Sequence, residues 1–133
     1  MMEHQCSDET HLLLRFEWSV RALAQDSDVQ ISLFPHFVCV ADELALDFEK
    51  SLNDLHLSNI DFTPEESASI LRLDAHILAI SGPEHEDLWT DDGLRKSAEW
   101  CELRRLARQL LEVTEWSTEA PPTDRAIYAG PDA

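Results

Sequence analysis

Apolar residues recur at every third or fourth position in four segments of this chain, which is the spacing of one face of an α-helix. The segments cover residues 8–25, 35 to about 56, 63–81 and 98 to about 116. Polar residues fill most of the positions between the apolar ones. The pattern therefore predicts four amphipathic helices.

The third segment has the clearest boundaries. The four residues from Thr63 to Glu66 read TPEE, which is a capping box with proline at the first helical position and satisfies the free amides of a helix start. At the other end, Gly82 can take the left-handed conformation that closes a helix, and Pro83 cannot continue one. This helix is predicted to run to Ser81.

The segments between and after these helices are less regular. Residues 29–34 alternate like a β-strand, but no second strand is present to pair with them, so we expect an extended linker. Thr90 is a good N-cap for one short helical turn, and Ser97 caps the last helix. Residues 117–133 hold three prolines and no apolar periodicity, which predicts an arm or a disordered tail.

A length of 133 residues is that of one domain. Four amphipathic helices joined by short connections pack best when helices adjacent in sequence touch. The expected fold is all-α, a four-helix antiparallel bundle-like single domain over residues 1–116, followed by the irregular segment 117–133.

Composition adds a strong constraint on partners. The chain has 27 acidic and 10 basic residues, a formal net charge of −17. Nucleic acid and anionic lipid are therefore disfavoured as direct partners, and a basic protein surface is favoured. The excess acid is also explained by solubility alone or by adaptation to a salty cytoplasm.

The sequence predicts neither a membrane span nor a secretory signal. The longest uncharged stretch, residues 29–41, is too short to cross a bilayer and contains Pro35. The first nine residues contain three acids, which does not suit a signal peptide. We expect a cytoplasmic protein that keeps Cys6, Cys39 and Cys101 reduced, since their number is odd and they lack CxxC spacing.

Charge is unevenly distributed along the chain. Residues 61–92 carry nine acids and one base, whereas residues 93–116 carry five bases and four acids. The first region supplies a candidate acidic face for a partner, made of Glu84, Glu86, Asp87, Asp91 and Asp92. The last helix supplies a candidate basic face, made of Arg104, Arg105 and Arg108. Either the two regions lie against each other, or the arginines meet an acidic partner.

Two helices carry apolar residues opposite their core-facing stripe. In the first helix these are Leu14 and Trp18, and in the second they are Cys39 and Leu46. An exposed tryptophan would forgo about 2–3 kcal/mol of burial, so we expect a partner, a second copy or the tail to cover it. The alternative is that the first helix lies centrally and is covered on both faces within the monomer.

Asp74 projects from the middle of the apolar face of the third helix. An unpaired carboxylate would be costly there, so Arg21, Arg15 or a backbone amide is expected to donate to it. The functional alternative is a general base or metal ligand in the bundle interior, although the sequence shows no second inward-facing acid.

His36, Cys39 and Glu43 lie at positions i, i+3 and i+7 of the second predicted helix and form a weak candidate metal site that lacks a fourth ligand. The adjacent residues His85, Glu86 and Asp87 lack the alternation of a calcium loop and are weaker still. Cys101 lies near the arginines of the last helix, as a reactive thiol would, but no histidine base is assigned to it. No cofactor is expected.

We find no nucleophile elbow, phosphate loop or dinucleotide fingerprint in the chain. The leading hypothesis is therefore a non-enzymatic protein interaction module, an adaptor, chaperone-like or toxin-neutralising protein, that recognises a basic partner and is a possible homodimer. The alternative is a small enzyme or metal-binding bundle that uses Asp74 or the face formed by His36, Cys39 and Glu43. A third hypothesis is a nucleic-acid mimic.

Overall fold

The computed structural model describes the backbone of residues 2–123 and the side chains of residues 9–123. Every regular element in this part of the chain is a helix, which confirms the predicted all-α class. The elements are α1 (Met2–Leu23), α2 (Ser27–Ser32), α3 (Val40–His56), α4 (Pro64–Ala79), the 3-10 helix η1 (Pro83–Trp89), α5 (Asp91–Lys96) and α6 (Ala98–Thr114).

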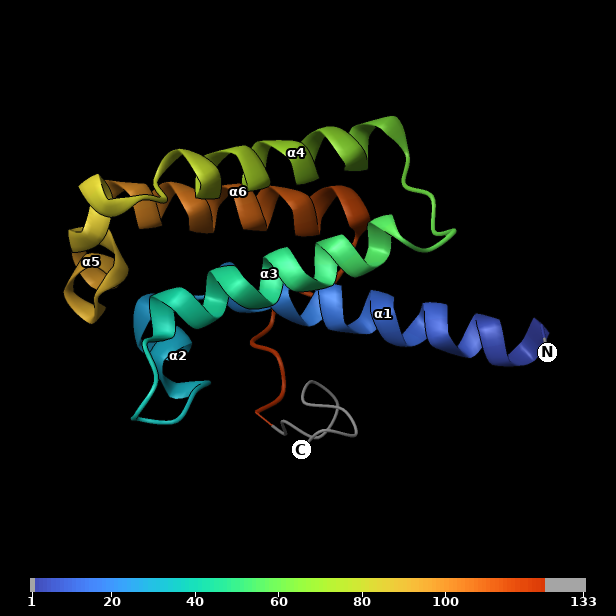
Figure 1. Cartoon of the computed structure of the whole chain (residues 1–133), viewed down its shortest axis with the longest axis horizontal. Coiled ribbons are helices and arrows are strands. Elements are labelled where there is room, and N and C mark those ends of the chain that lie inside the picture. Colours follow the sequence, from blue (N-terminus) through green and yellow to red (C-terminus); the bar gives the residue numbers. More distant parts are fainter. Residues whose placement is uncertain (1, 124–133) are drawn as a thin grey trace.

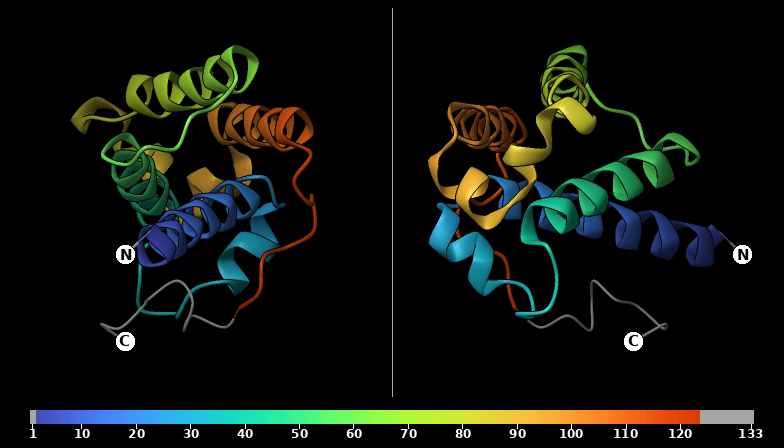
Figure 2. Two further views of the ribbon diagram at one scale, coloured as in Figure 1. Left: turned by 90° about the vertical axis from the view of Figure 1, so that its right-hand side faces the viewer. Right: turned by 60° about the vertical axis from the view of Figure 1, so that its left-hand side comes forward.

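The four long helices run in alternating directions along the long axis of the molecule (Figure 1). α1 packs against both α3 and α6, and α4 packs against α6 (Figure 2). Among the described helices, α3 and α4 lack a comparably close backbone approach and face each other across a wider seam. The predicted four-helix bundle is therefore not confirmed in detail, because its fourth side is open.

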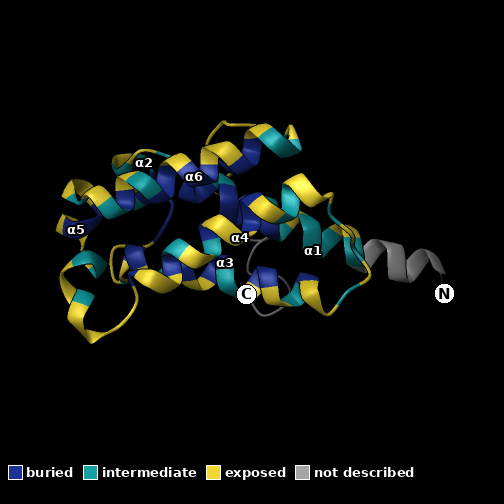
Figure 3. Cartoon of the chain, turned by 90° about the horizontal axis from the view of Figure 1, so that it is seen from above, coloured by how far each residue is buried: buried dark blue, intermediate teal, exposed yellow. Residues whose placement is uncertain are grey.

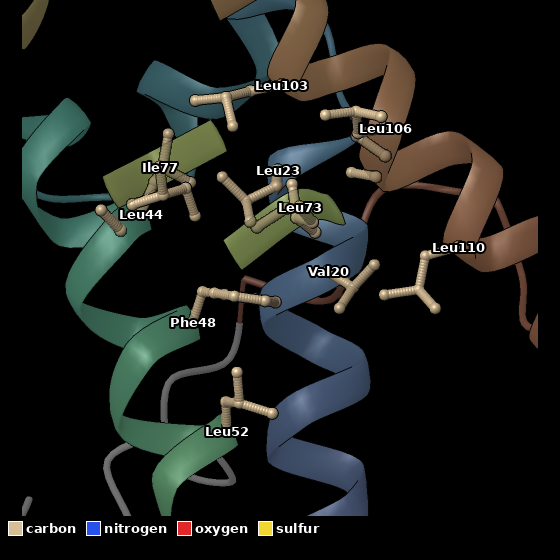
Figure 4. Close-up of a cluster of buried hydrophobic side chains, with 14 of the residues drawn as sticks. Val20, Leu23, Leu44, Phe48, Leu52, Leu73, Ile77, Leu103, Leu106 and Leu110 are labelled. Carbon is tan, nitrogen blue, oxygen red and sulfur yellow. The ribbon is translucent and has the colours of Figure 1, made fainter. Parts of the chain in front are cut away.

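The core lies where α1, α3, α4 and α6 meet, and buried positions alternate with exposed ones along α3 and α6 (Figure 3). Leucine, isoleucine and valine side chains from all four helices point toward one another there (Figure 4). Phe16 of α1 stacks on Phe48 of α3 with ring centroids 5.5 Å apart, and both are fully buried. Each such side chain contributes about 1.5–3 kcal/mol through burial, so these helices depend on tertiary packing rather than on intrinsic propensity.

The caps predicted for α4 and α6 are confirmed. Thr63 Oγ1 accepts a hydrogen bond from the backbone of Glu66 at 3.1 Å, and Glu66 Oε1 accepts one from the backbone of Thr63 at 2.9 Å. Ser97 Oγ accepts from the backbone of Trp100 at 3.1 Å. α4 ends at Ala79, two residues before the predicted end, and Gly82 then turns the chain with a φ of 121°.

The expected extended linker at residues 29–34 is wrong, because most of this segment belongs to α2. Gln30 explains the difference. Its side chain is fully buried, and its Nε2 donates to the carbonyls of Ala22 and Leu23 at 3.2 and 3.0 Å, at the end of α1. The short helix is therefore stabilised by contacts with a neighbouring helix end, which its local pattern does not reveal.

The second long helix begins at Val40 and not at Pro35 as predicted. The carbonyl of Pro35 accepts a hydrogen bond from the backbone of Val38 at 3.4 Å, which closes a turn before the helix starts. Phe37 lies in this turn and is 89% exposed.

Residues 117–122 of the predicted arm lie along α1. Arg21 donates to the carbonyls of Glu119 and Ala120 at 3.0 and 3.1 Å, and Gln25 donates to the carbonyl of Thr118 at 3.1 Å. The first part of the arm is thus held through its backbone. The rest of the predicted arm, residues 124–133, lies outside the described residues.

Candidate partner-binding groove

Two grooves follow the seam between α3 and α4. The first, here called the Trp89 groove, has a volume of about 570 Å³. Its lining comprises Asp42, Ala45, Leu46, Glu49, Ile77, Leu78, Ser81, Gly82 and Trp89. The second, the Phe62 groove, has a volume of about 380 Å³. Its lining comprises Leu52, His56, Ile60, Asp61, Phe62, Ser67, Ile70 and Leu71.

Three large apolar side chains of these grooves are exposed to solvent. Leu46 is 60% exposed, Leu71 is 64% exposed and Leu78 is 61% exposed. They come from both helices and lie beside buried core residues such as Ile70 and Ile77. An apolar surface that is continuous with the core and follows a seam is the type of surface that another chain covers.

The end of the Trp89 groove is rigid. The indole Nε1 of Trp89 donates to the carbonyl of Ile80 at 2.8 Å, and its ring packs edge-on against Trp100 with centroids 5.5 Å apart. Cys39 Sγ donates to the carbonyl of Trp89 at 3.2 Å. These contacts hold the wall of the groove in place without an occupant.

Two carboxyl groups are here called the acid pair: Glu49 of α3, at the edge of the Trp89 groove toward the Phe62 groove, and Asp74 of α4, between the segments of that helix that line the two grooves. Glu49 Oε1 and Asp74 Oδ1 are buried, and no described group donates a hydrogen bond to either oxygen. Burial raises the pKa of Glu49 from its usual 4.5 to about 7, with further contributions from a hydrogen bond to Asp74 and from the charge of Asp74. The two carboxyl groups are therefore in contact, and Glu49 is partly protonated at neutral pH.

Two expectations about Asp74 are wrong: its pairing with an arginine and the absence of a second inward-facing acid. No ion pair in the described part of the chain joins Asp74 to Arg15 or Arg21. Arg21 instead contacts Glu17 and the arm. A second acid, Glu49, does face Asp74, and the sequence missed it because the pairing crosses from one helix to another.

Basic side chains near the seam are directed elsewhere. Lys50 pairs with Asp54 at 3.6 Å, one turn along α3. Arg72 donates to Ser69 Oγ at 3.3 Å, and the His76 ring lies 3.3 Å from the carbonyl of Glu99. The described linings of the two grooves include three acidic residues. They include one histidine and neither lysine nor arginine. The seam is therefore an apolar surface with negative charge at its centre and margins.

The residues predicted for an interface have different positions in the structure. Trp18 is only 4% exposed, because its ring packs edge-on against Phe34 and its Nε1 donates to the carbonyl of Pro122 at 2.9 Å. An interface stripe that includes Trp18 is therefore wrong, because Phe34 and the tail, one of the expected covers, bury this side chain within the monomer. Leu14 is 48% exposed and Leu46 lies in the Trp89 groove. Cys39 precedes α3 and therefore does not share a helix face with Leu46.

The five acids of the predicted acidic face, Glu84, Glu86, Asp87, Asp91 and Asp92, are all exposed on η1 and α5. Lys96 pairs with Asp92 at 3.8 Å, one turn along α5. The acidic face is thus present as a solvated surface next to the end of the Trp89 groove, which Trp89 of η1 forms.

The three arginines of α6 do not form one basic face. Arg104 is buried and donates to Gln30 Oε1 at 3.1 Å and to the carbonyl of Leu94, and its burial lowers its pKa. Arg105 pairs with Glu102 at 2.6 Å. Arg108 donates to the carbonyl of Ala24 at 3.0 Å and pairs with Asp26 at 3.3 Å.

Within residues 9–123 no ion pair joins the acidic face to these arginines, although α5, which carries Asp91 and Asp92, packs against α6. The arginines use nearer partners. Arg104 bridges α2, α5 and α6 in the interior, and Arg108 is bonded to the turn between α1 and α2.

The helical spacing expected of His36, Cys39 and Glu43 is also wrong, because α3 begins after the first two residues. Within the described side chains, no group of three or more His, Cys, Asp or Glu residues is arranged to hold a metal ion. Burial raises the pKa of the Cys39 thiol, which keeps it protonated at neutral pH.

No family model, no curated protein and no solved structure matches this chain. None of the described helices combines the length and apolar character that crossing a bilayer requires. Any assignment of function therefore depends on the seam itself.

Proposed function

We propose that the protein is a non-enzymatic interaction module, and that its α3/α4 seam binds a basic amphipathic helix of a protein partner. The observation that carries this proposal is the combination of an open apolar seam with an acid pair that no described cation neutralises. Helix-in-groove recognition uses such surfaces, with apolar anchors for affinity and charge for orientation.

The occupant is argued from charge complementarity. A partner with acidic residues facing the seam would meet Asp42, Asp61 and the acid pair with like charge. A second copy of this chain would carry the same net charge of −17, which disfavours it as an occupant. A basic helix is attracted over a long range and can then bury Leu46, Leu71 and Leu78.

A second candidate function is supported by one observation. A carboxyl group with a pKa of about 7 beside a groove is suited to general acid–base catalysis at neutral pH. We rank this below binding because the described lining of the Trp89 groove contains no histidine, cysteine or metal cluster beside Glu49 to complete a catalytic set.

The proposal is tested with a fluorescein-labelled model helix of leucine and lysine whose leucines form one face. A scrambled peptide of the same composition is the peptide control. We expect the amphipathic peptide to bind the full chain with at least about tenfold higher affinity, measured by anisotropy, because only it can present an apolar face to the seam.

The site of binding is tested with Leu46→Gln and Leu78→Gln. Each should weaken binding about tenfold, since each removes roughly one leucine of apolar contact. Leu57→Gln is the matched control, because Leu57 is 81% exposed and lies in neither groove. Equal binding of the scrambled peptide, or an equal effect of all three substitutions, would contradict the proposal.

A further inference from the structure

We propose that the helix that binds the seam carries one lysine or arginine that inserts at the acid pair. One apolar anchor lies about one turn before this residue and another about one turn after it, so that each anchor fills one groove. This inference rests on the proposed function and specifies the partner's sequence pattern. Its basis is the order of features along the seam.

The acid pair lies between the centres of the two grooves, because Glu49 is the last residue of α3 that lines the Trp89 groove and Asp74 lies between the two lining segments of α4. On α3, residues 42–49 line the Trp89 groove and residues 52–56 line the Phe62 groove. On α4, Ile77 and Leu78 line the Trp89 groove and residues 67–71 line the Phe62 groove, while Ser81 and Gly82 line the Trp89 groove just after the helix ends. Because α3 and α4 run in opposite directions (Figure 1), the two helices give the same order of apolar groove, acid pair and apolar groove.

The spacing follows from helix geometry. The midpoints of the two lining segments are about eight to nine residues apart on both α3 and α4, or roughly 13 Å at the helical rise per residue. A partner helix that lies along the seam matches this with apolar anchors at i and i+8. The residue at i+4 then falls at the acid pair, and all three side chains lie within an arc of about 80°.

A cation is favoured at the central position because the acid pair lacks donors. Glu49 forms a hydrogen bond with Asp74, but Glu49 Oε1 and Asp74 Oδ1 are both buried and have no partner among the described groups. An ammonium or guanidinium group can donate to both carboxylates. Its arrival releases the proton of Glu49 to solvent, leaving two carboxylates and one cation in place of one carboxylate and one carboxylic acid.

A neutral side chain at the central position would bury the acid pair further without supplying a donor. A buried polar group that loses water and gains no partner weakens binding. The acid pair therefore selects for a cation, while the two grooves select for the apolar residues at its sides.

The experiment uses three labelled helical peptides that are identical except at the central position, which is Lys, Gln or Glu. All three have leucine anchors at i and i+8 and lysines on the opposite face, so that each remains cationic. We expect the Lys peptide to bind the full chain about tenfold more tightly than the Gln peptide, and the Glu peptide to bind most weakly.

The double variant Glu49→Gln/Asp74→Asn should abolish the preference for Lys over Gln. The double variant Asp28→Asn/Asp92→Asn is the matched control: it removes two negative charges, which is at least as many as the acid pair carries at neutral pH, from exposed residues outside both grooves and should retain the preference. Far-UV circular dichroism verifies that both variants fold. If the first double variant does not fold, the ranking of the three peptides on the unsubstituted chain still tests the inference.

The outcomes separate this inference from the proposed function. If the Lys and Gln peptides bind equally tightly and Leu46→Gln still weakens both, the seam binds helices and the acid pair does not select a cation. If no peptide binds, both proposals fail. Affinity of the Lys peptide should also rise between pH 6 and pH 8, whereas affinity of the Gln peptide should not.

Discussion

Glu49 exchanges a proton near neutral pH because it is partly buried beside Asp74, which raises its pKa to about 7. Its pKa in the unfolded chain is close to 4.5, so the folded state binds the proton more tightly. The contribution to stability is therefore complete below pH 4.5 and is lost as the pH rises through 7. Above that pH the folded protein carries two adjacent carboxylates in the seam.

The first prediction is that Glu49→Gln removes this pH dependence. Glutamine cannot ionise, so the free energy of unfolding of the variant should exceed that of the unsubstituted protein by more at pH 8 than at pH 5. Urea titrations at the two pH values measure the difference. Asp28→Asn, which changes an exposed acid on α2, should show no such trend. A constant difference would mean that Glu49 has an ordinary pKa.

Gly93 is buried in α5, directly against the backbone of η1. A Cβ atom at this position would lie well inside van der Waals contact of the carbonyl oxygens of Asp87 and Leu88. Backbone atoms cannot rotate away as a side chain can, so the two elements would have to separate.

The second prediction is that Gly93→Ala destabilises the protein by about 1–3 kcal/mol. Helix propensity predicts the opposite sign, because alanine is the better helix former by about 1 kcal/mol. Thermal unfolding therefore decides between the two effects. A melting temperature equal to or above that of the unsubstituted protein would show that η1 can move to accommodate the methyl group.

At the scale of elements, the arm and α1 stabilise each other through a few polar contacts. Arg21 donates to two carbonyls of the arm and Trp18 donates to a third, while Pro121 is buried between them and the body of the protein. These hydrogen bonds are accepted by backbone carbonyls of the arm, and the side chains of residues 117–120 remain exposed. The arm is therefore held at a few points and is open to local detachment.

The third prediction is that Arg21→Met loosens the arm. The substitution keeps the apolar stem and removes two hydrogen bonds, each worth about 0.5–1.5 kcal/mol. Cleavage after Glu119 by a glutamate-specific protease should become faster. Arg72→Met is the control, because Arg72 is exposed on α4 and its guanidinium contacts Ser69. If both variants are cleaved at the rate of the unsubstituted protein, Trp18 and Pro121 suffice to hold the arm.

The long helices were predictable because their signals are local. The capping box at Thr63 and the apolar periodicity of α6 both act within a few residues. α2 was not predictable because Gln30 stabilises it through carbonyls at the end of α1. The burial of Arg104 was not predictable either. The pattern placed it on a charged face, whereas its hydrogen bonds to Gln30 and to the carbonyl of Leu94 hold it in the interior.

The candidate site was predictable only in part. Asp74 stands out in the sequence as an acid on an apolar face, and Leu46 as an apolar residue opposite a core stripe. Their meeting in one seam depends on how α3 and α4 are placed, and this follows from the packing of α3 on α1 and of α4 on α6. Glu49 has no unusual local pattern, so its pairing with Asp74 could not be found from helix periodicity alone.

At the scale of the whole molecule, the net charge and the seam should act on different stages of the proposed binding. A charge of −17 produces an attractive field for a cationic partner well beyond contact distance. The leucines of the seam act only once water has been expelled from the interface. The field should therefore determine how fast a basic helix arrives, and the apolar contacts should determine how long it stays.

The fourth prediction follows from this separation. Raising sodium chloride from 50 to 500 mM shortens the screening length from about 14 Å to about 4 Å, so the association rate constant of the leucine–lysine helix should fall at least tenfold. Leu46→Gln should instead raise the dissociation rate constant about tenfold at each salt concentration and leave association nearly unchanged. Stopped-flow anisotropy measures both constants. An association rate constant that does not change with salt would show that the acidic field does not guide the partner. A dissociation rate constant that depends on salt would show that the ion pairs form at the exposed margin of the seam rather than at the buried acid pair.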